Sequence, residues 1–189
     1  MAVLLAGGAG TRLGGAKPLA ELGARPLMHH PLDVLMRVAE RVAVICKPDT
    51  VLAVLPQGVE RWDEPAEPRH PLTGIIQALE RAREPVLVCA ADMPWITGEA
   101  CRRLVDSAAK GAPAAVAEAS GRLSPTFAVY RPACLAILRA AAPGAPLWRT
   151  VGALRPVRVE LPAELLRSIN TPQELAAAER ELRALRKGA

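Results

Sequence analysis

Short apolar segments alternate with helical patterns along this chain, and that alternation limits the folds open to it more than any other feature. The segments are rich in small and β-branched residues, as expected of strands buried on both faces. Strands separated by helices form a mostly parallel sheet with helices on both sides. The sequence therefore predicts an α/β fold with three layers, α/β/α, built on a Rossmann-like sheet in a single domain over residues 1–189. The expected strands are 2–6, 42–46, 86–90, 114–117, 126–130 and 157–161, and the expected helices are 28–40, 72–83, about 97–110 and one after Thr171.

Two helix starts can be located from their capping residues. Thr97 precedes a helical pattern and is a residue type that caps helix N-termini. Thr171, Pro172 and Glu174 together have the order of a capping box, with proline at the first helical position. The proline-rich stretch 56–71 carries several acidic residues and is expected to be a loop.

A glycine-rich loop follows the first apolar segment, in the run VLLAGGAGTRLGGAK at residues 3–17. Glycines let backbone N–H groups converge on an anion, and Arg12 and Lys17 add full positive charges. The loop is not a Walker A motif, because Ala16 stands where the lysine belongs, and it is not a dinucleotide fingerprint, because Leu13 replaces the third glycine. A surface turn without a ligand is the alternative, but the pattern favours a phosphate-binding loop.

Asp92 directly follows the apolar segment 86–90, in the sequence Ala-Asp-Met-Pro. The carboxyl ends of parallel strands meet at one edge of a sheet, so this carboxylate is expected to lie beside the phosphate-binding loop. Mg²⁺ often takes only one or two protein carboxylates together with phosphate oxygens. Asp92 is therefore a candidate magnesium ligand, with the alternative that it caps the following turn.

Charge and cysteine content limit the kinds of binding partner and the cellular compartment expected for this protein. The net charge is +5, from 24 basic and 19 acidic residues, but the arginines are dispersed and no basic cluster with aromatic residues stands out. We therefore expect no nucleic-acid partner. The cysteines show no metal-binding spacing and are expected to be small core residues in a reducing compartment. With no signal peptide or membrane segment evident, the prediction is a cytoplasmic protein with no membrane partner. The cysteines are Cys46, Cys89, Cys101 and Cys134.

Motifs spread over nearly the whole chain resemble a known family. The opening LAGGxGTRLGG-x-K-P-L is similar to the signature of nucleotidyltransferases that move NMP from an NTP to a phosphorylated acceptor. The order and spacing of the later motifs resemble the molybdenum cofactor guanylyltransferase family. These motifs are PLTGIIQAL (71–79), CAADMPWI (89–96), SPTFAVYR (124–131) and SINTPQEL (168–175).

The resemblance implies a function and a set of site residues. The function is Mg²⁺-dependent transfer of GMP from GTP to the phosphate of molybdenum-bound molybdopterin, with release of pyrophosphate and transient contacts to other proteins of molybdenum cofactor biosynthesis. Asp92 and Asn170 are the implied metal ligands, and Arg122 is a candidate acceptor contact. The catalytic residues would be Arg12, Lys17 and Asp92, and the nucleotide-binding residues Leu5, Ala6, Gly7, Gly8, Lys17, Asp63, Gly74 and Asp92.

Two positions depart from the family pattern and keep other functions open. Ala16 stands where an acidic residue usually precedes the loop lysine, and Lys47 stands where many relatives have a nucleotide-contacting Asn. Asn170 could equally be structural, since it directly precedes a helix cap. The alternatives are CTP as donor, 2-phospholactate or a sugar phosphate as acceptor, or a regulatory nucleotide-binding domain without catalysis.

Overall fold

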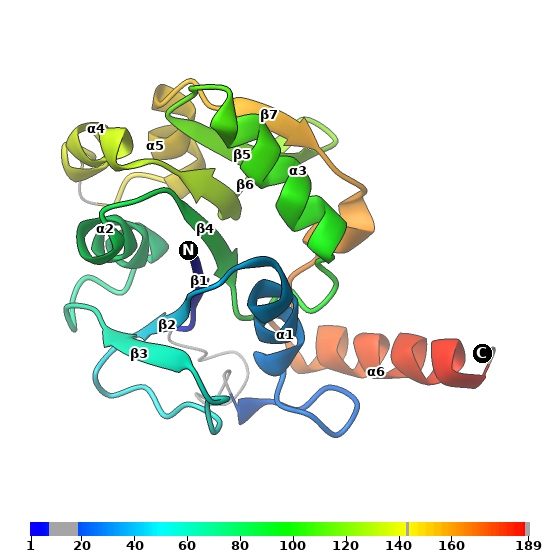
Figure 1. Ribbon diagram of the computed structural model, residues 1–189. Helices are drawn as coiled ribbons and strands as arrows, with labels where there is room; N and C mark the ends of the chain where they lie inside the picture. The colour runs from blue at the N-terminus through cyan, green and yellow to red at the C-terminus, as the bar shows by residue number, and fades with distance from the viewer. Residues whose placement is uncertain (8–18, 143, 188–189) are drawn as a thin grey trace.

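A computed structural model describes residues 1–7, 19–142 and 144–187 of the chain (Figure 1). The strands are β1 (Ala2–Leu5), β2 (Val42–Cys46), β3 (Val59–Asp63), β4 (Val86–Ala90), β5 (Ala114–Ala119), β6 (Arg122–Tyr130) and β7 (Val157–Glu160). The α-helices are α1 (His29–Val38), α2 (Pro71–Ala82), α3 (Gly98–Ala109), α4 (Leu135–Arg139), α5 (Leu147–Ala153) and α6 (Pro172–Lys187). Short 3₁₀ helices occupy Pro132–Cys134 and Ala163–Leu166.

The strands of the described residues form one seven-stranded sheet in the order β3-β2-β1-β4-β6-β5-β7. β1 pairs in parallel with both β2 and β4, and β2 pairs in parallel with β3. β6 runs antiparallel to its neighbours β4 and β5, while β5 and β7 are parallel. The chain moves outward from β1 to β3 and then returns to place β4 on the other side of β1. The strand order therefore reverses between β1 and β4, which is where open α/β sheets bind ligands.

Helices cover both faces of the sheet, so the predicted three-layer α/β/α arrangement is confirmed (Figure 1). Leu32 of α1 and Leu104 of α3 lie in the core on one face, whereas Leu79 of α2, Leu138 of α4 and Val151 of α5 lie in the core on the other. Period-two alternation sends the side chains of each strand to opposite faces. In this way each central strand contributes to both cores.

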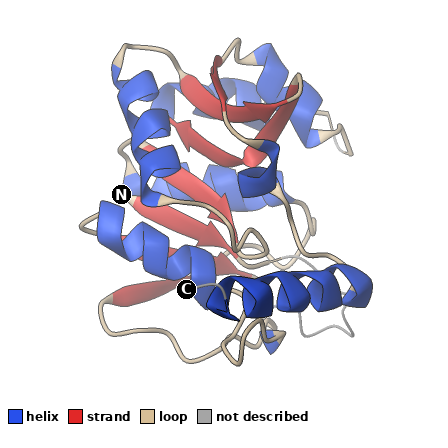
Figure 2. Ribbon diagram, turned by 90° about the vertical axis from the view of Figure 1, so that its right-hand side faces the viewer, coloured by secondary structure: helices blue, strands red, loops and turns tan. Residues whose placement is uncertain are grey.

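The final helix, α6, lies outside the two sheet-facing layers and extends away from the body of the molecule (Figure 1). In the view turned by 90° it lies in front of the rest of the chain (Figure 2). A separate apolar cluster joins Leu175 and Ala178 of α6 to Leu22, Leu27 and Ile169. The predicted capping box is present: the Thr171 N–H donates to Glu174 Oε2 at 3.0 Å, and the Glu174 N–H donates to Thr171 Oγ1 at 3.2 Å. The helix start, and with it the preceding segment, is thereby fixed.

The expectation that 56–71 is a loop was wrong in part, because β3 lies within it. β3 is an edge strand of the sheet, and Trp62 is its buried side chain, so the segment lacks an apolar run. Pairing with β2, and not an intrinsic pattern, makes this segment a strand. The short helices α4 and α5 were also not anticipated.

Thr97 caps α3 as predicted, since its Oγ1 accepts a hydrogen bond from the Ala100 N–H at 3.2 Å. Replacing Thr97 with alanine is expected to lower the free energy of unfolding by about 1 kcal/mol, or the melting temperature by roughly 2–4 °C. Thermal unfolding followed by circular dichroism measures this loss. Thr97→Ser, which keeps the acceptor oxygen, should retain most of the stability, and an equal loss in both variants would show that the cap is not the cause.

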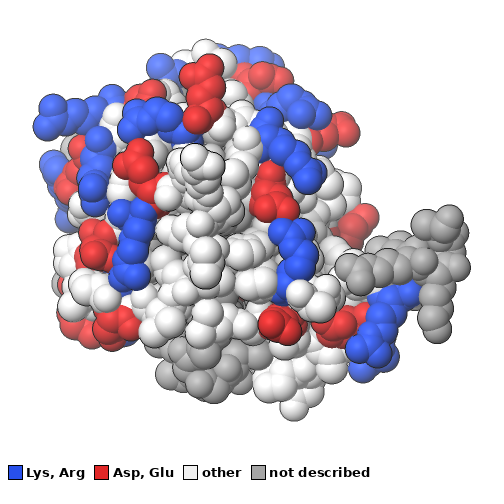
Figure 3. All heavy atoms as spheres, turned by 60° about the horizontal axis from the view of Figure 1, so that its bottom comes forward, with Lys and Arg blue, Asp and Glu red and all other residues white. Residues whose placement is uncertain are grey.

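Surface charges of both signs are mixed. Figure 3 shows Lys and Arg side chains beside Asp and Glu side chains on the two sides of one face, with uncharged residues between them. Ion pairs such as Arg25–Asp33 at 2.7 Å contribute to this mixing.

The four cysteines are buried and free, and burial raises the pKa of Cys46 to about 11. Within the described residues, the structure contains no helix of the length and apolar character needed to cross a bilayer.

Candidate active site

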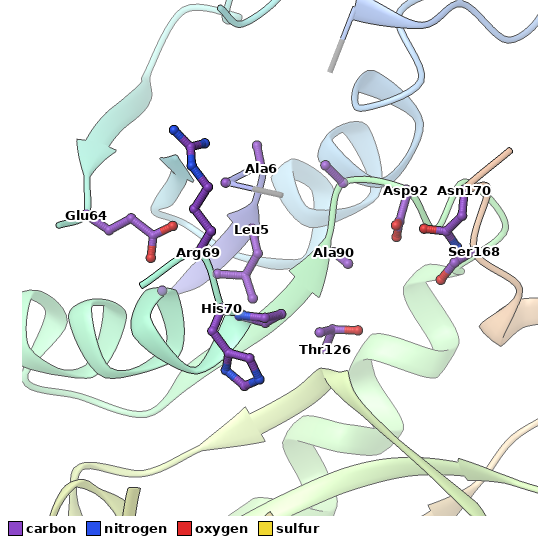
Figure 4. A pocket seen from close by; sticks show the side chains of 14 residues that line it. Leu5, Ala6, Glu64, Arg69, His70, Ala90, Asp92, Thr126, Ser168 and Asn170 are labelled. Atoms are coloured by element: carbon purple, nitrogen blue, oxygen red, sulfur yellow. The ribbon is translucent and has the colours of Figure 1, made fainter. Parts of the chain in front are cut away.

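A pocket of about 300 Å³ opens where the strand order reverses, beyond the carboxyl ends of β1 and β4 (Figure 4). It brings together segments that are far apart in the sequence, including the end of β1, the start of α2 and the segment before α6. This is the sheet edge at which the sequence analysis placed the site. The lining residues are Leu5, Ala6, Gly7, Glu64, Arg69, His70, Pro71, Gly74, Ala90, Ala91, Asp92, Thr126, Ser168 and Asn170.

Backbone hydrogen bonds hold the ends of the central strands together at the pocket floor. The Ala6 N–H donates to the Ile45 carbonyl at 2.8 Å, and the Ala91 N–H donates to the Leu5 carbonyl at 3.0 Å. Gly7 follows at a position where a Cβ atom would collide with the Glu64 carboxylate, so a side chain there would require Glu64 to move. Leu5, Ala6 and Gly7, three of the expected nucleotide-binding residues, line the pocket. The other predicted residues of this loop, Gly8, Arg12 and Lys17, lie outside the described residues.

Asp92 and Asn170 lie beside one another on one side of the pocket (Figure 4). Asp92 follows β4, and its carbonyl accepts a hydrogen bond from the Ile169 N–H at 2.9 Å, which ties the two segments together. The Asn170 N–H donates to Glu174 Oε2 at 2.7 Å. The capping box therefore holds the Asn170 backbone, and Asn170 also lines the pocket.

Glu64, and not Asp63, enters the pocket from the end of β3. The Asp63 side chain is 53% exposed, accepts a hydrogen bond from Arg61 Nε at 2.9 Å and does not line the pocket. The next residue, Glu64, is 5% exposed and lines it. Because successive side chains of an extended segment point to opposite sides, a shift of one residue moves the carboxylate from the surface to the pocket.

The Glu64 carboxylate occupies space that two glycines leave open. A Cβ atom on Gly74 would lie 3.2 Å from Glu64 Oε2 and 2.9 Å from Leu5 Cδ2, and Gly7 is close to the other carboxylate oxygen. Gly74 lies in the first turns of α2 and lines the pocket, as expected for a nucleotide-binding position. Glu64 Oε2 is buried and has no hydrogen-bond partner within the described part of the chain. An acceptor oxygen is thus available to a ligand.

Lys47 lies behind Glu64 and is fully buried. Its Nζ lies 3.4 Å from Glu64 Oε1 and does not line the pocket. Burial raises the pKa of the Glu64 carboxyl, while the charge of Lys47 acts in the opposite direction. The position where the family resemblance led us to expect an Asn therefore holds, in this chain, a lysine that faces a neighbouring carboxylate.

Sequence reasoning missed three further pocket residues. Arg69 and His70 precede α2, and Thr126 comes from β6. His70 caps α2, because its Nδ1 accepts a hydrogen bond from the Leu72 N–H at 3.2 Å. The motif 71–79 could have drawn attention to the preceding His70, and Thr126 lies within the motif 124–131, although no residue of that motif was singled out. Arg122, the candidate acceptor contact, is exposed at the start of β6 and does not line this pocket.

The oxygen atoms on the Asp92 side of the pocket are suitable ligands for a hard cation. A carboxylate, an amide and a hydroxyl are present there, from Asp92, Asn170 and Ser168. These supply oxygen ligands, which Mg²⁺ prefers, and the open pocket leaves positions for water and phosphate oxygens. The described residues contain no cluster of three or more His, Cys, Asp or Glu side chains that could hold a metal by themselves.

Comparison with known proteins places this site within a family. Residues 2–180 match the family described as "MobA-like NTP transferase domain". A relative from Rhizobium leguminosarum, named "Molybdenum cofactor guanylyltransferase", is 30% identical over 208 residues, covering 97% of this chain and 93% of the relative. A relative from Mycobacterium bovis, named "Probable molybdenum cofactor guanylyltransferase", is 33% identical over 133 residues, 68% of this chain and 66% of the relative.

Solved structures share the fold. "Molybdopterin-guanine dinucleotide biosynthesis protein A" from Archaeoglobus fulgidus superposes with a TM-score of 0.72 at 22% identity, covering 97% of this chain and 98% of that one. "2-C-methyl-D-erythritol 4-phosphate cytidylyltransferase" from Thermus thermophilus gives a TM-score of 0.70 at 24% identity, covering 96% of this chain and 98% of that one. The family resemblance of the sequence motifs is confirmed, and the chain belongs to the MobA-like NTP transferase family of nucleotidyltransferases.

Proposed function

We propose that this protein transfers GMP from GTP to the terminal phosphate of molybdenum-bound molybdopterin and releases pyrophosphate. The observation that carries the proposal is one pocket, at the reversal of strand order, that joins the end of β1 to Asp92 after β4. The names of the relatives at 30–33% identity support the choice of substrates. The buried free thiols fit a reducing compartment such as the cytoplasm.

The reaction forms one phosphorus–oxygen bond and breaks another. An oxygen of the acceptor phosphate attacks the α-phosphorus of GTP, and the bond from that phosphorus to the oxygen bridging the α- and β-phosphates breaks, so that the β- and γ-phosphates leave as pyrophosphate. The work of the protein is to position two anionic substrates and to offset their charge, with no covalent enzyme intermediate. Arg12 and Lys17, with the backbone of Gly7 and Gly8, are proposed to hold the triphosphate.

Asp92 and Asn170 are proposed to hold Mg²⁺, with Ser168 nearby. When bound, the ion would neutralise charge on the phosphate oxygens as the bond is transferred. Asp92 is held from two sides, by β4 before it and by the hydrogen bond between its carbonyl and the Ile169 N–H. Such support fixes the carboxylate relative to the end of β1, where the phosphates would lie.

Glu64 is proposed to contact the guanine base, in place of the Asp63 expected from the sequence. Guanine presents adjacent N–H donors at N1 and N2, and a carboxylate can accept both. Figure 4 shows Glu64 and Asp92 on opposite sides of the pocket, with Leu5 and Ala90 between them. The base and the metal would therefore bind at the two ends of one pocket.

A nucleotide panel tests the proposal. With Mg²⁺ and molybdenum-bound molybdopterin, the protein is expected to release pyrophosphate from GTP at least about tenfold faster than from ATP, CTP or UTP, because the polar groups of a nucleobase site reject mismatched bases. Pyrophosphate release and mass detection of the dinucleotide product measure this. Reactions without acceptor, and with a chelator, are the controls.

Each other outcome points to a specific alternative. Faster release from CTP would replace guanine by cytosine as the transferred base. GTP-dependent release only with 2-phospholactate or a sugar phosphate would change the acceptor. Tight GTP binding that is indifferent to Mg²⁺, with no pyrophosphate under any acceptor, would make the chain a regulatory nucleotide-binding domain.

A further inference from the structure

Lys47 and Glu64 are paired by the register of the sheet. Cys46 of β2 lies opposite Asp63 of β3, so the next residues of both strands, Lys47 and Glu64, leave the sheet side by side. The Glu64 N–H donates to the Cys46 carbonyl at 2.9 Å, which continues the ladder to this point. Both side chains are buried, at 0% and 5% exposure. The pairing of β2 with β3 thus places the Lys47–Glu64 ion pair at one end of the pocket.

The hydrogen-bonding capacity of Lys47 is taken up inside the protein. Its Nζ donates to the Pro65 carbonyl at 2.7 Å and to the Pro68 carbonyl at 2.8 Å, and it lies 3.4 Å from Glu64 Oε1. A lysine ammonium has three donors, and three acceptors surround this one. Lys47 therefore has no N–H left for a ligand, and its contact with a ligand runs through Glu64.

The two oxygens of Glu64 have different surroundings. Oε1 faces Lys47, whereas Oε2 has no hydrogen-bond partner among the described residues and lies against Gly74 of the pocket lining. A buried acceptor without a partner is costly, so a ligand that donates to it recovers that cost. The pair thus presents one fixed, negatively charged acceptor to the pocket.

We propose that Lys47 is a positioning residue that sets nucleobase selectivity, by keeping Glu64 ionised and turning one of its oxygens toward the base. This inference rests on the function proposed above. Guanine offers the carboxylate two adjacent donors. Adenine and cytosine each place a ring-nitrogen acceptor beside their amino donor, and that acceptor would face a negative oxygen. Selectivity therefore comes from repulsion of the wrong bases as well as attraction of guanine.

The surrounding charges favour an ionised Glu64 against the effect of burial. Burial raises the pKa of Glu64, and the charges of Lys47 and then Arg69 lower it. His70 lines the pocket beside Arg69, and the neighbouring Asp63 pairs with Arg61 away from it. Without Lys47, the carboxyl would hold its proton at higher pH and would offer an O–H donor where guanine needs an acceptor.

The test is a double-mutant cycle on nucleotide binding. GTP, ATP and CTP are titrated with Mg²⁺ into the wild type, Lys47→Met, Glu64→Gln and the double variant, by calorimetry. Each single variant is expected to bind GTP about tenfold more weakly or worse, with little change for ATP and CTP. Lys47→Met should cause no further loss in the Glu64→Gln background, because Lys47 acts through Glu64.

The pH dependence separates charge control from a merely structural role. As pH rises through the pKa of Glu64, the carboxyl ionises and GTP binding should strengthen, and this rise should lie at higher pH in Lys47→Met than in the wild type. Glu64→Gln should lose the rise. Circular dichroism confirms folding of each variant, and if Lys47→Met does not fold, the comparison of Glu64→Gln with the double variant and the wild-type pH profile decide the matter.

Arg61→Gln is the matched control. Arg61 also donates to the loop after β2, through the Lys47 carbonyl at 3.3 Å and the Pro48 carbonyl at 3.1 Å, but it does not line the pocket. It should leave base preference unchanged. An equal loss in Arg61→Gln, or a further loss from Lys47→Met in the Glu64→Gln background, would overturn the inference. Because binding needs no acceptor, failure of the proposed transfer reaction would show separately, as selective GTP binding without pyrophosphate release.

Discussion

Replacing Asp92 with asparagine is expected to abolish nucleotidyl transfer while leaving the protein folded. Asparagine has nearly the same shape, so the loop after β4 and its hydrogen bond to Ile169 should survive. The lost negative charge would weaken binding of the ion that offsets charge on the phosphates, an effect worth several kcal/mol. The rate of pyrophosphate release should fall by roughly 10³-fold or more, and a Mg²⁺ titration should show a raised requirement for the metal.

Asp63→Asn provides the control for this experiment. Asp63 is an exposed carboxylate outside the pocket, so its variant should retain activity and GTP binding. Loss of GTP binding in Asp63→Asn would instead support Asp63 as the nucleotide contact, as expected from the sequence. Normal turnover by Asp92→Asn would remove Asp92 from the mechanism.

Replacing Lys47 with methionine is expected to be the most destabilising single change at the site. It leaves Glu64 buried, at 5% exposure, without the opposite charge beside it. Breaking a buried pair from one side costs about 3–5 kcal/mol, which corresponds to a fall in melting temperature of roughly 6–20 °C. Removing the second charge as well, in Lys47→Met/Glu64→Gln, should recover much of the loss. Thermal and urea unfolding measure both.

The loss in Lys47→Met should depend on pH. The pKa of Glu64, ordinarily 4.5, is already raised by burial and would rise further without Lys47. A carboxyl with a raised pKa binds its proton more tightly in the folded state than in the unfolded state. The loss of folding stability from ionising Glu64 is therefore absent at pH values below the ordinary pKa, and it grows as pH rises toward the raised pKa. Unfolding at about pH 5 should therefore show a smaller loss than at pH 8. An equal loss at both would assign it to the broken contacts with Pro65 and Pro68.

The central strands and the Asp92 side of the pocket could be predicted from sequence because each carries a local signal. β1, β2 and β4 are continuous apolar runs, and a polar residue at the end of such a run, as with Asp92, must lie at the ligand-binding edge. The order of Thr171, Pro172 and Glu174 likewise fixed the start of α6. These features depend on neighbours in the chain and not on distant contacts.

The Glu64 side of the pocket could not be predicted, because it depends on β3. With Trp62 as its buried residue, β3 has no period-two pattern, and without the strand the opposite orientations of Asp63 and Glu64 are invisible. Lys47 stood out as a departure from the family, but its partner follows another strand. Only the pairing of β2 with β3 brings the two together.

The segment Ser168–Asn170, tied to Asp92 through Ile169, also bears on the order in which the site is made. Synthesis proceeds from the N-terminus, so a growing chain has both central strands and the loop carrying Asp92 long before this wall of the pocket exists. A ligand stabilises a fold only to the extent that it binds the folded form. A ligand that needs this wall can therefore assist the last step of folding, the docking of the segment before α6, but not the earlier assembly of the central strands.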